Sequence, residues 1–285
     1  MSGNAGFGIA NGHSNGGPSA SATLRITNCA VSGNAGVGIS NFGVGILHAT
    51  LTITNCTVSG NRGGGISNIS TVSEATLTVS KCTISGNSGS NGGGIDNKAT
   101  GGFCCDPQCG RCGSLSTVAI SNSTLSGNSA TGDGGAVYNN GVDIGFVRLS
   151  VNSCTISDNS APNGGGIYVG GSSSLGLGDT ILKAGSSGHN IFNNGGAVTS
   201  LGYNLASDNG GGFLTGPGDQ INTQPRLGPL QDNGGPTLTH ALLPGSPAIN
   251  RGNPNFTAPP FFDQRGPRYH RVVNGRIDIG AFEVQ

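Results

Sequence analysis

The residues of this chain that could bind a ligand or catalyse a reaction are acidic and aromatic residues, which occur at equivalent positions of a repeated segment. A glycine-rich box recurs along the chain, and one position in it is occupied in turn by Ala10, Ser40, Ser67, Asp96, Tyr138 and Tyr168. Because aromatic faces stack on sugar rings, Asp96, Tyr138 and Tyr168 form the best candidate ligand-binding strip. The alternative is that these tyrosines are ordinary exposed strand residues.

Catalysis on polysaccharides would need more acids than this pattern provides. A lyase needs several carboxylates on neighbouring coils to hold calcium, with an arginine or lysine base, and a hydrolase needs paired carboxylates. The first hundred residues contain only Glu74 and Asp96 as acids. Asp133, Asp158 and Asp179 could approach one another across coils, but each also fits a turn, where aspartate is common. The sequence therefore predicts no catalytic residue and no cofactor.

The eight cysteines fall into two groups. Four share one position of the repeat, where a disulfide or metal stack is possible but small buried hydrophobic side chains are favoured: Cys29, Cys56, Cys82 and Cys154. The other four lie in an insertion, KATGGFCCDPQCGRCGSL (98–115): Cys104, Cys105, Cys109 and Cys112. These are candidates for one or two disulfides, which would fit an oxidising compartment. Zinc is the weaker alternative, because the one C-x-x-C pair lacks a partner pair.

Histidines and arginines give no clear catalytic or phosphate-binding pattern. The five histidines are scattered and match no H-x-x-x-H spacing. Near the C-terminus four arginines lie between two aspartates, and we expect a salt-bridged structure there: Arg265, Arg268, Arg271 and Arg276, with Asp263 and Asp278.

The elements that position these residues are copies of one repeat. The copies read LRITNCAVSGN (24–34), LTITNCTVSGN (51–61), LTVSKCTISGN (77–87), VAISNSTLSGN (118–128) and LSVNSCTISDN (149–159), each followed by a glycine-rich box. Leu51 and Ile53 alternate with threonines, which is the period of a strand with one apolar face. The alternation breaks at Asn55 and resumes with Cys56 and Val58. Three short strands per copy predict an all-β fold, a right-handed, single-stranded parallel β-helix with three sides.

Stacking such coils about 4.8 Å apart lines up equivalent residues. The pattern predicts an inward aliphatic stack of Val31, Val58, Ile84, Leu125 and Ile156. It also predicts two corner stacks of asparagines, whose amides can bond to the equivalent amide one coil away: Asn34, Asn61, Asn87, Asn128 and Asn159, and Asn11, Asn41, Asn68, Asn97 and Asn139.

A change of composition marks a boundary near residue 217. Ten of the thirteen prolines lie between Pro217 and Pro267, and six of the ten arginines lie from Arg226 onward. We therefore predict a β-helix over 1–216, interrupted by the insertion at 98–115, and a Pro/Arg-rich C-terminal cap over 217–285. Since a last coil exposes unpaired backbone, we expect the cap to pack on the open end of the helix.

Charge and hydropathy exclude some partners. Charged residues make up 9% of the chain and its formal net charge is zero, so a basic nucleic-acid surface is not supported. No apolar run approaches transmembrane length, and residues 1–20 lack the charged start and apolar core of a signal peptide. The chain opens inside a repeat box, so we expect a fragment whose export signal and anchor lie outside this sequence.

The repeats resemble those of right-handed parallel β-helix proteins, and the GGA[VI]-type boxes are similar to those of polymorphic outer-membrane and autotransporter-like proteins. The C-terminal motifs SLGYNL (200–205), NTQPRLGPLQDNGGPTLTHALLPGSPAINRGNP (222–254) and DQRGPRYHRVVNGRIDIGAFE (263–283) resemble the choice-of-anchor Q region of bacterial secreted β-helix proteins. This resemblance implies an extracellular or cell-surface location, and function in that family is mostly unassigned.

Together these features predict a secreted or surface β-helix protein with a structural, adhesive or glycan-contacting role and no catalysis. Its expected partners are extracellular polysaccharide or components of the cell envelope. The alternative is a polysaccharide lyase or glycoside hydrolase of the pectate-lyase-like β-helix class, since fold alone does not determine function.

Overall fold

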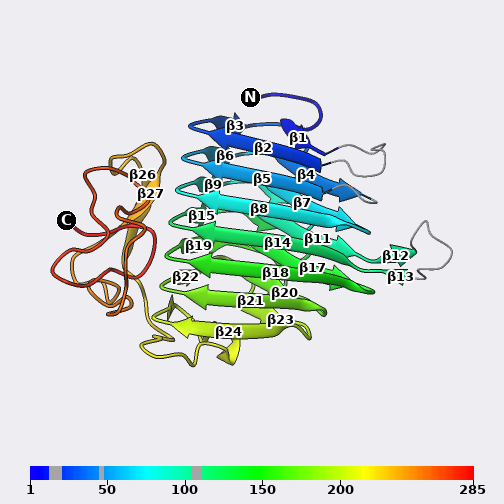
Figure 1. Ribbon diagram of the computed structural model, residues 1–285. Coiled ribbons are helices and arrows are strands. Elements are labelled where there is room, and N and C mark those ends of the chain that lie inside the picture. Colours follow the sequence, from blue (N-terminus) through cyan, green and yellow to red (C-terminus); the bar gives the residue numbers. More distant parts are fainter. Residues whose placement is uncertain (13–20, 45–47, 104–110) are drawn as a thin grey trace.

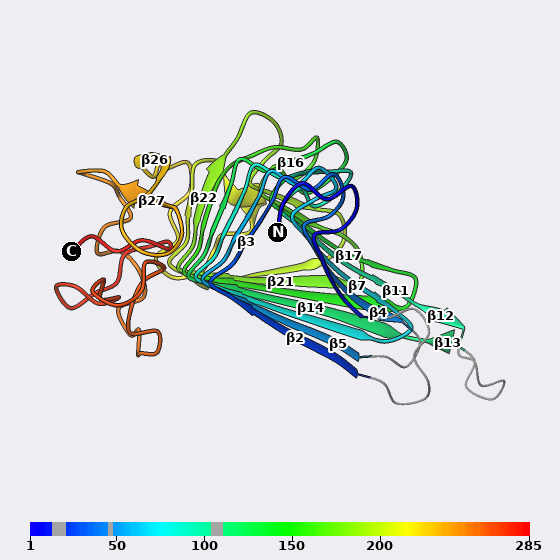
Figure 2. The same cartoon turned by 90° about the horizontal axis from the view of Figure 1, so that it is seen from above.

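The chain coils into a parallel β-solenoid with three seven-stranded sheets (Figure 1). This computed structural model describes residues 1–12, 21–44, 48–103 and 111–285. Seen from the N-terminal end, the chain runs clockwise as it recedes from the viewer, which is a right-handed coil (Figure 2). The predicted all-β, three-sided β-helix is thereby confirmed.

Each coil contributes its strands to the sheets in the same order, first to sheet A, then to sheet B and then to sheet C. Sheet A contains β3 (Ala30–Ser32), β6 (Thr57–Ser59), β9 (Thr83–Ser85), β15 (Thr124–Ser126), β19 (Thr155–Asn159), β22 (Ile181–Ala184) and β25 (Leu205–Ala206). Sheet B contains β1 (Ile9–Asn11), β4 (Ile39–Val44), β7 (Ile66–Thr71), β11 (Ile95–Thr100), β17 (Val137–Val142), β20 (Ile167–Val169) and β23 (Ile191–Asn193). Sheet C contains β2 (Ser21–Thr27), β5 (His48–Thr54), β8 (Glu74–Ser80), β14 (Ser114–Ser121), β18 (Gly145–Asn152), β21 (Ser173–Gly178) and β24 (Ala197–Gly202).

Three short strand pairs and one helical turn complete the described structure. They are the parallel pair β10 (Ser88–Gly89) and β16 (Ser129–Ala130), the antiparallel pairs β12 (Gly102–Phe103) with β13 (Arg111–Cys112) and β26 (Leu227–Gln231) with β27 (Thr239–Leu242), and the 3₁₀ turn η1 (Gly210–Gly212). Within the described ranges, no helix has the length and apolar character needed to cross a membrane.

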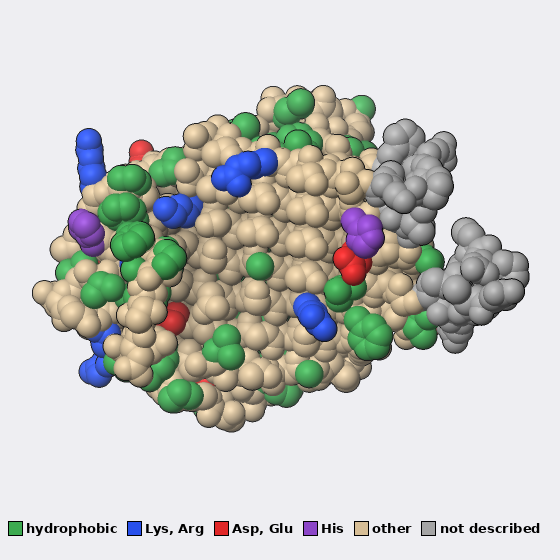
Figure 3. All heavy atoms as spheres, viewed as in Figure 1, with side chains coloured by type: hydrophobic (Ala, Val, Ile, Leu, Met, Phe, Trp, Pro, Cys, Tyr) green, Lys and Arg blue, Asp and Glu red, His purple; other side chains and the backbone are tan. Residues whose placement is uncertain are grey.

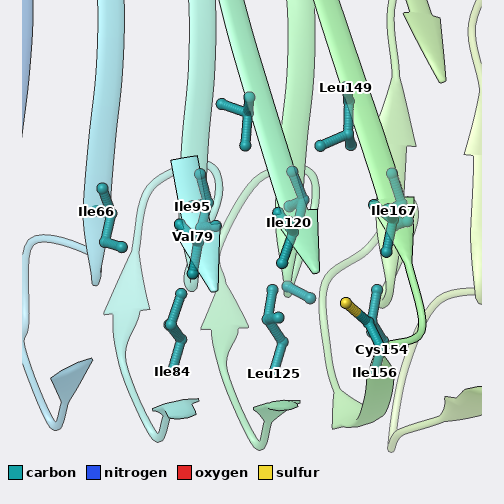
Figure 4. Packing of buried hydrophobic residues seen from close by; sticks show 14 of the residues in the cluster. Ile66, Val79, Ile84, Ile95, Ile120, Leu125, Leu149, Cys154, Ile156 and Ile167 are labelled. Carbon is teal, nitrogen blue, oxygen red and sulfur yellow. The ribbon is translucent and has the colours of Figure 1, made fainter. Parts of the chain in front are cut away.

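The core is built from the predicted aliphatic stacks. Along β5 the apolar residues Leu51 and Ile53 are fully buried, and the threonines that alternate with them are partly exposed. In sheet A, Val58 pairs in register with Ile84, and every member of that predicted stack is fully buried. Figure 4 shows how such side chains from neighbouring coils point into the same interior (Figure 4). Each strand thus buries one face in the solenoid interior and turns its alternate residues outward, as the period of two requires.

The corner between sheets C and A explains the break in alternation at Asn55. Asn55 takes a φ of 52°, and the equivalent residue of every neighbouring coil also lies in the left-handed region: Asn28, Lys81, Asn122, Ser153, Asp179 and Tyr203. Asparagine and aspartate tolerate this conformation better than other residues with a Cβ. Asp158 has a φ of 59° at the next corner, so Asp158 and Asp179 both occupy the turn positions predicted for them.

Asparagine amides form two continuous ladders along the solenoid. In the first, Asn61 Nδ2 donates to Asn87 Oδ1 over 2.9 Å, and Asn61 backbone N–H donates to the same oxygen over 3.0 Å. Asn87 repeats both bonds toward Asn128. In the second ladder Asn68 Nδ2 donates to Asn97 Oδ1 over 2.9 Å. These corner asparagines are almost wholly buried, so the ladders satisfy amides that would otherwise be costly to remove from water.

The repeated cysteines form a third ladder and are free thiols. The backbone N–H of Cys29 donates to Cys56 Sγ, and that of Cys56 donates to Cys82 Sγ. Further along, Thr180 and Asn204 take the same acceptor position. Cys56, Cys82 and Cys154 are fully buried, as predicted, whereas Cys29 is exposed.

The last coil is covered by the segment that directly follows it. Residues 203–223 turn back on the end of the solenoid, where Tyr203 N–H donates to Pro217 O and Ala206 N–H donates to Gln220 O. Leu214 is buried in the main hydrophobic core at this end, and Phe213 packs beside it. The exposed strand edge is thereby paired locally.

The remaining residues, 224–285, form a unit that we call the C-terminal unit, and it lies beside sheet A (Figures 1 and 2). The expectation that this segment covers the open end is therefore wrong for its larger part. Leu242 of this unit is buried, whereas Leu238 and Leu243 are exposed. The physical reason is that sheet A offers the C-terminal unit hydrogen-bonding threonines on its middle coils and the apolar side chains of Ile181 and Leu205 on its last coils.

Gln264 is the centre of this contact. Its Nε2 donates to Thr83 Oγ1 over 3.1 Å and to Cys82 O over 3.2 Å, and its Oε1 accepts from Thr124 Oγ1 over 2.6 Å. One coil further, Thr155 Oγ1 accepts from Ala281 N–H over 3.1 Å. The threonines that the repeat places outward on sheet A are thus the docking strip for the C-terminal unit.

Candidate functional site

Three aromatic rings stack on the outer face of sheet B. Asp96 pairs in register with Tyr138, Tyr138 with Tyr168, and Tyr168 with Phe192. The ring centroids lie 5.1 Å apart for Tyr138 and Tyr168 and 5.8 Å apart for Tyr168 and Phe192, with nearly parallel planes. The structure therefore brings the predicted strip together as one column and adds Phe192 to it.

Stacking changes what these rings can offer a ligand. Tyr138 is 9% exposed and Tyr168 is 6% exposed, because each ring covers the face of the next one. The tyrosine rings consequently present edges and hydroxyl groups to solvent, not open faces. Phe192, at the end of the column, is partly exposed. A ligand on this face would meet Phe192, the ring edges and Asp96.

The tyrosine hydroxyls are held by amides from the neighbouring positions. Asn140 Nδ2 donates to the Tyr138 hydroxyl over 2.8 Å, and Asn194 Nδ2 donates to the Tyr168 hydroxyl over 2.9 Å. Each hydroxyl therefore keeps its own proton free to donate to a ligand. This column of polar edges is fixed in place by the same coil spacing that stacks the rings.

Asp96 lies at the other end of the column in an apolar setting. Burial raises the pKa of Asp96 to about 6, and the nearby Lys98 charge opposes the rise. Its Oδ1 is buried and has no hydrogen-bond partner among the described residues. The carboxyl group therefore gains its proton at a higher pH than an ordinary aspartate does, and its unpaired Oδ1 lies beneath the surface of the column.

The other acids flagged by the sequence lie apart, each with its own partner. Asp133 accepts from Asn163 Nδ2 over 2.9 Å, Asp158 pairs with Lys183, and Asp179 accepts from Asn253 N–H over 2.7 Å. Across the described ranges there is no group of three or more histidine, cysteine, aspartate or glutamate side chains that could hold a metal ion.

The cysteine-rich insertion is only partly described. Cys104, Cys105 and Cys109 lie outside the described residues. The backbone of Cys112 belongs to β13, which pairs with β12 in antiparallel orientation, and its side chain is not described. Disulfide bonds and a zinc site in this insertion stay predictions.

Of the arginines and acids predicted to form salt bridges in the C-terminal unit, Arg265 and Asp263 form a buried ion pair. Arg265 Nη2 lies 2.7 Å from Asp263 Oδ2, and the guanidinium is sandwiched between the Tyr269 and Phe282 rings at 3.8 and 3.7 Å. Arg271 Nη1 lies 3.8 Å from Glu283 Oε2, and both side chains are buried. Such enclosed guanidinium groups hold the unit together and are not placed to bind phosphate.

Sequence reasoning missed Phe192 because its coil departs from the repeat. HNIFNNGGAV (189–198) lacks the box that precedes Tyr138 and Tyr168. The one available signal was a large side chain immediately after Ile191, since isoleucine or valine precedes the outward residue in the other boxes as well. That pattern places Phe192 in the column.

Comparisons with known proteins identify no relative. No family model matches the chain, and neither a curated protein nor a solved structure matches it.

Proposed function

We propose that this protein is a secreted or cell-surface β-helix protein with a structural and adhesive role, which contacts polysaccharide through the outer face of sheet B without catalysing a reaction. The observation that carries the proposal is the continuous column of Asp96, Tyr138, Tyr168 and Phe192. Its ring edges, hydroxyl groups and one carboxyl group are the kinds of groups that bind sugars.

The neighbouring outward positions on sheet B support the same role. Phe42, Ile69, Lys98 and Asn140 occupy equivalent places on successive coils and are partly exposed. The face thus offers apolar, amide and charged groups repeated about every 4.8 Å. A rigid, regularly spaced surface suits a partner that is itself a regular polymer.

The proposed location at the cell surface is based on the sequence motifs of 200–283, which resemble those of choice-of-anchor Q proteins. In this proposal the β-helix is the exposed part of a surface protein. The outer face of sheet C is a broad, mostly uncharged polar surface, which is compatible with contact to other envelope material (Figure 3).

Retention on insoluble polysaccharides tests the proposal. The full chain is incubated with cellulose, xylan and chitin, and the unbound fraction is measured. We expect retention on at least one polymer and a clear loss in Phe192→Ala, because this variant removes the exposed end of the column. Phe146→Ala is the matched control, since Phe146 is 60% exposed and lies on β18 of sheet C. The contact proposal fails if no polymer retains the protein or if both variants lose retention equally.

A second assay tests the absence of catalysis. The protein is incubated with polygalacturonate and calcium, and unsaturated products are followed by their ultraviolet absorbance. Release of reducing ends is measured on the same neutral polymers. Sustained product formation that scales with protein concentration would identify a lyase or hydrolase instead of an adhesive protein.

A further inference from the structure

A groove of about 550 Å³ separates one corner of the solenoid from the C-terminal unit. One wall is formed where β8, β14 and β18 end, and the other by residues of the segment 253–260. Figure 1 shows these strand ends facing the C-terminal unit. Its volume lies in the range of about 300 to 1,000 Å³ that is typical of small-molecule sites.

The solenoid wall presents regularly spaced polar groups. Ser80, Ser121 and Asn152 are equivalent residues on three successive coils and all line the groove. The corner residues that follow them, among them Lys81 and Asn122, line it as well. Hydroxyl and amide groups at coil spacing can each donate and accept hydrogen bonds.

Asn122 contributes an acceptor that the protein does not use. The side chain is 2% exposed, and its Nδ2 donates to Phe262 O over 3.3 Å. Its Oδ1 has no partner among the described residues. A buried oxygen without a donor is unfavourable, so a hydroxyl group that reaches the floor of the groove would be stabilised there.

The opposite wall adds an apolar surface and is fixed to the solenoid. Phe256 lines the groove and is partly exposed. The segment is attached at its start, where Asn253 N–H donates to Asp179 Oδ1 over 2.7 Å. Lys81 and Asp179 contribute opposite charges to the lining, so the groove favours neither anions nor cations strongly.

We propose that this groove binds a neutral mono- or disaccharide. Sugar hydroxyls pair with Ser121, Asn122 and Asn152, and the apolar C–H face of the sugar lies on Phe256. The site is separate from the sheet B column, and the proposal does not depend on polysaccharide contact there.

Titration of the full chain with single sugars tests this site. The probes are the methyl glycosides of glucose, galactose, mannose and xylose, together with N-acetylglucosamine, and binding is followed by NMR shifts of backbone amides. We expect at least one probe to shift the amides of Ser121 and Asn122. Asn152→Trp fills the groove and Phe256→Ala removes its apolar wall, so each should weaken binding about tenfold or more.

Thr54→Trp is the matched control, because Thr54 is the equivalent residue on β5 and does not line the groove. It should bind the sugar like the wild type, as should Phe192→Ala. The proposal is overturned if no probe shifts these amides at about 50 mM, a concentration well above the millimolar dissociation constants of weak single-site ligands. It is also overturned if Asn152→Trp and Phe256→Ala, both shown to be folded by circular dichroism, bind as tightly as the wild type.

Discussion

Replacing Asn87 by alanine tests how much one rung of the asparagine ladder contributes to stability. The side chain is fully buried and makes four hydrogen bonds. Two are accepted from Asn61, and two are donated to Val58 O and to Asn128 Oδ1. Each net bond contributes about 1 kcal/mol, so the loss should be about 4 kcal/mol of unfolding free energy. That is a large part of the roughly 5 to 15 kcal/mol that stabilises an ordinary domain.

The measurement is denaturant-induced unfolding followed by far-ultraviolet circular dichroism. Asn152→Ala is the control, because Asn152 is exposed, and it should change stability by about 0.5 kcal/mol or less. Asn87→Asp keeps the size of the side chain and its acceptors but loses both donors. It should therefore be about as harmful as alanine at neutral pH.

Two results would refute the reasoning. The first is a loss below about 1 kcal/mol in Asn87→Ala, which would mean that the four bonds contribute no more than their hydration in the unfolded chain. The second is wild-type stability in Asn87→Asp, which would show that filling the corner matters and that donating to the next coil does not.

Three further changes have defined outcomes. Val58→Asp should abolish folding, because it places a charge in the buried aliphatic stack, whereas Ser59→Asp on the same strand should still fold. Identical circular dichroism spectra for the two variants would contradict the inward orientation of Val58. Burial raises the pKa of Glu283 to about 9 from 4.5, so the folded state holds a proton that the unfolded chain releases. Stability should be highest below the unfolded value and fall by up to about 1.4 kcal/mol per pH unit as pH rises toward 9, and Glu283→Gln should remove this slope in urea titrations. Deleting Gly102–Cys112 should leave the solenoid folded, because β11 still pairs with β17; an insoluble product would contradict this.

The repeat determined what the sequence could predict. Equivalent residues such as Val58 and Ile84 were expected to stack, because every copy of the repeat forms the same coil and the coils lie directly on one another. The same argument placed Asp96, Tyr138 and Tyr168 in one column. It could not show that the tyrosine rings would cover each other's faces, because ring orientation depends on packing between coils.

The position of the C-terminal unit could not be predicted in this way. Its main contact joins Gln264 to Thr83 and Thr124, which lie far earlier in the chain and belong to an unrelated pattern. Periodicity contains no information about such a pairing. The threonines were correctly placed outward, but nothing in the repeat distinguishes a threonine facing water from one facing a partner.

The hydrogen bonds between corner asparagines of successive coils share one direction along the solenoid axis. From Asn34 to Asn128, each corner asparagine donates one Nδ2 bond to the Oδ1 of the asparagine on the following coil, so these bonds all point toward the later coils. There Asp208 accepts from Asn190, and Asp219 accepts from Asn204. A carboxylate accepts but cannot donate, so hydrogen bonding from coil to coil cannot continue beyond either aspartate. Two copies meeting at these ends would bring carboxylates together without donors, so charge as well as coverage protects this end from self-association.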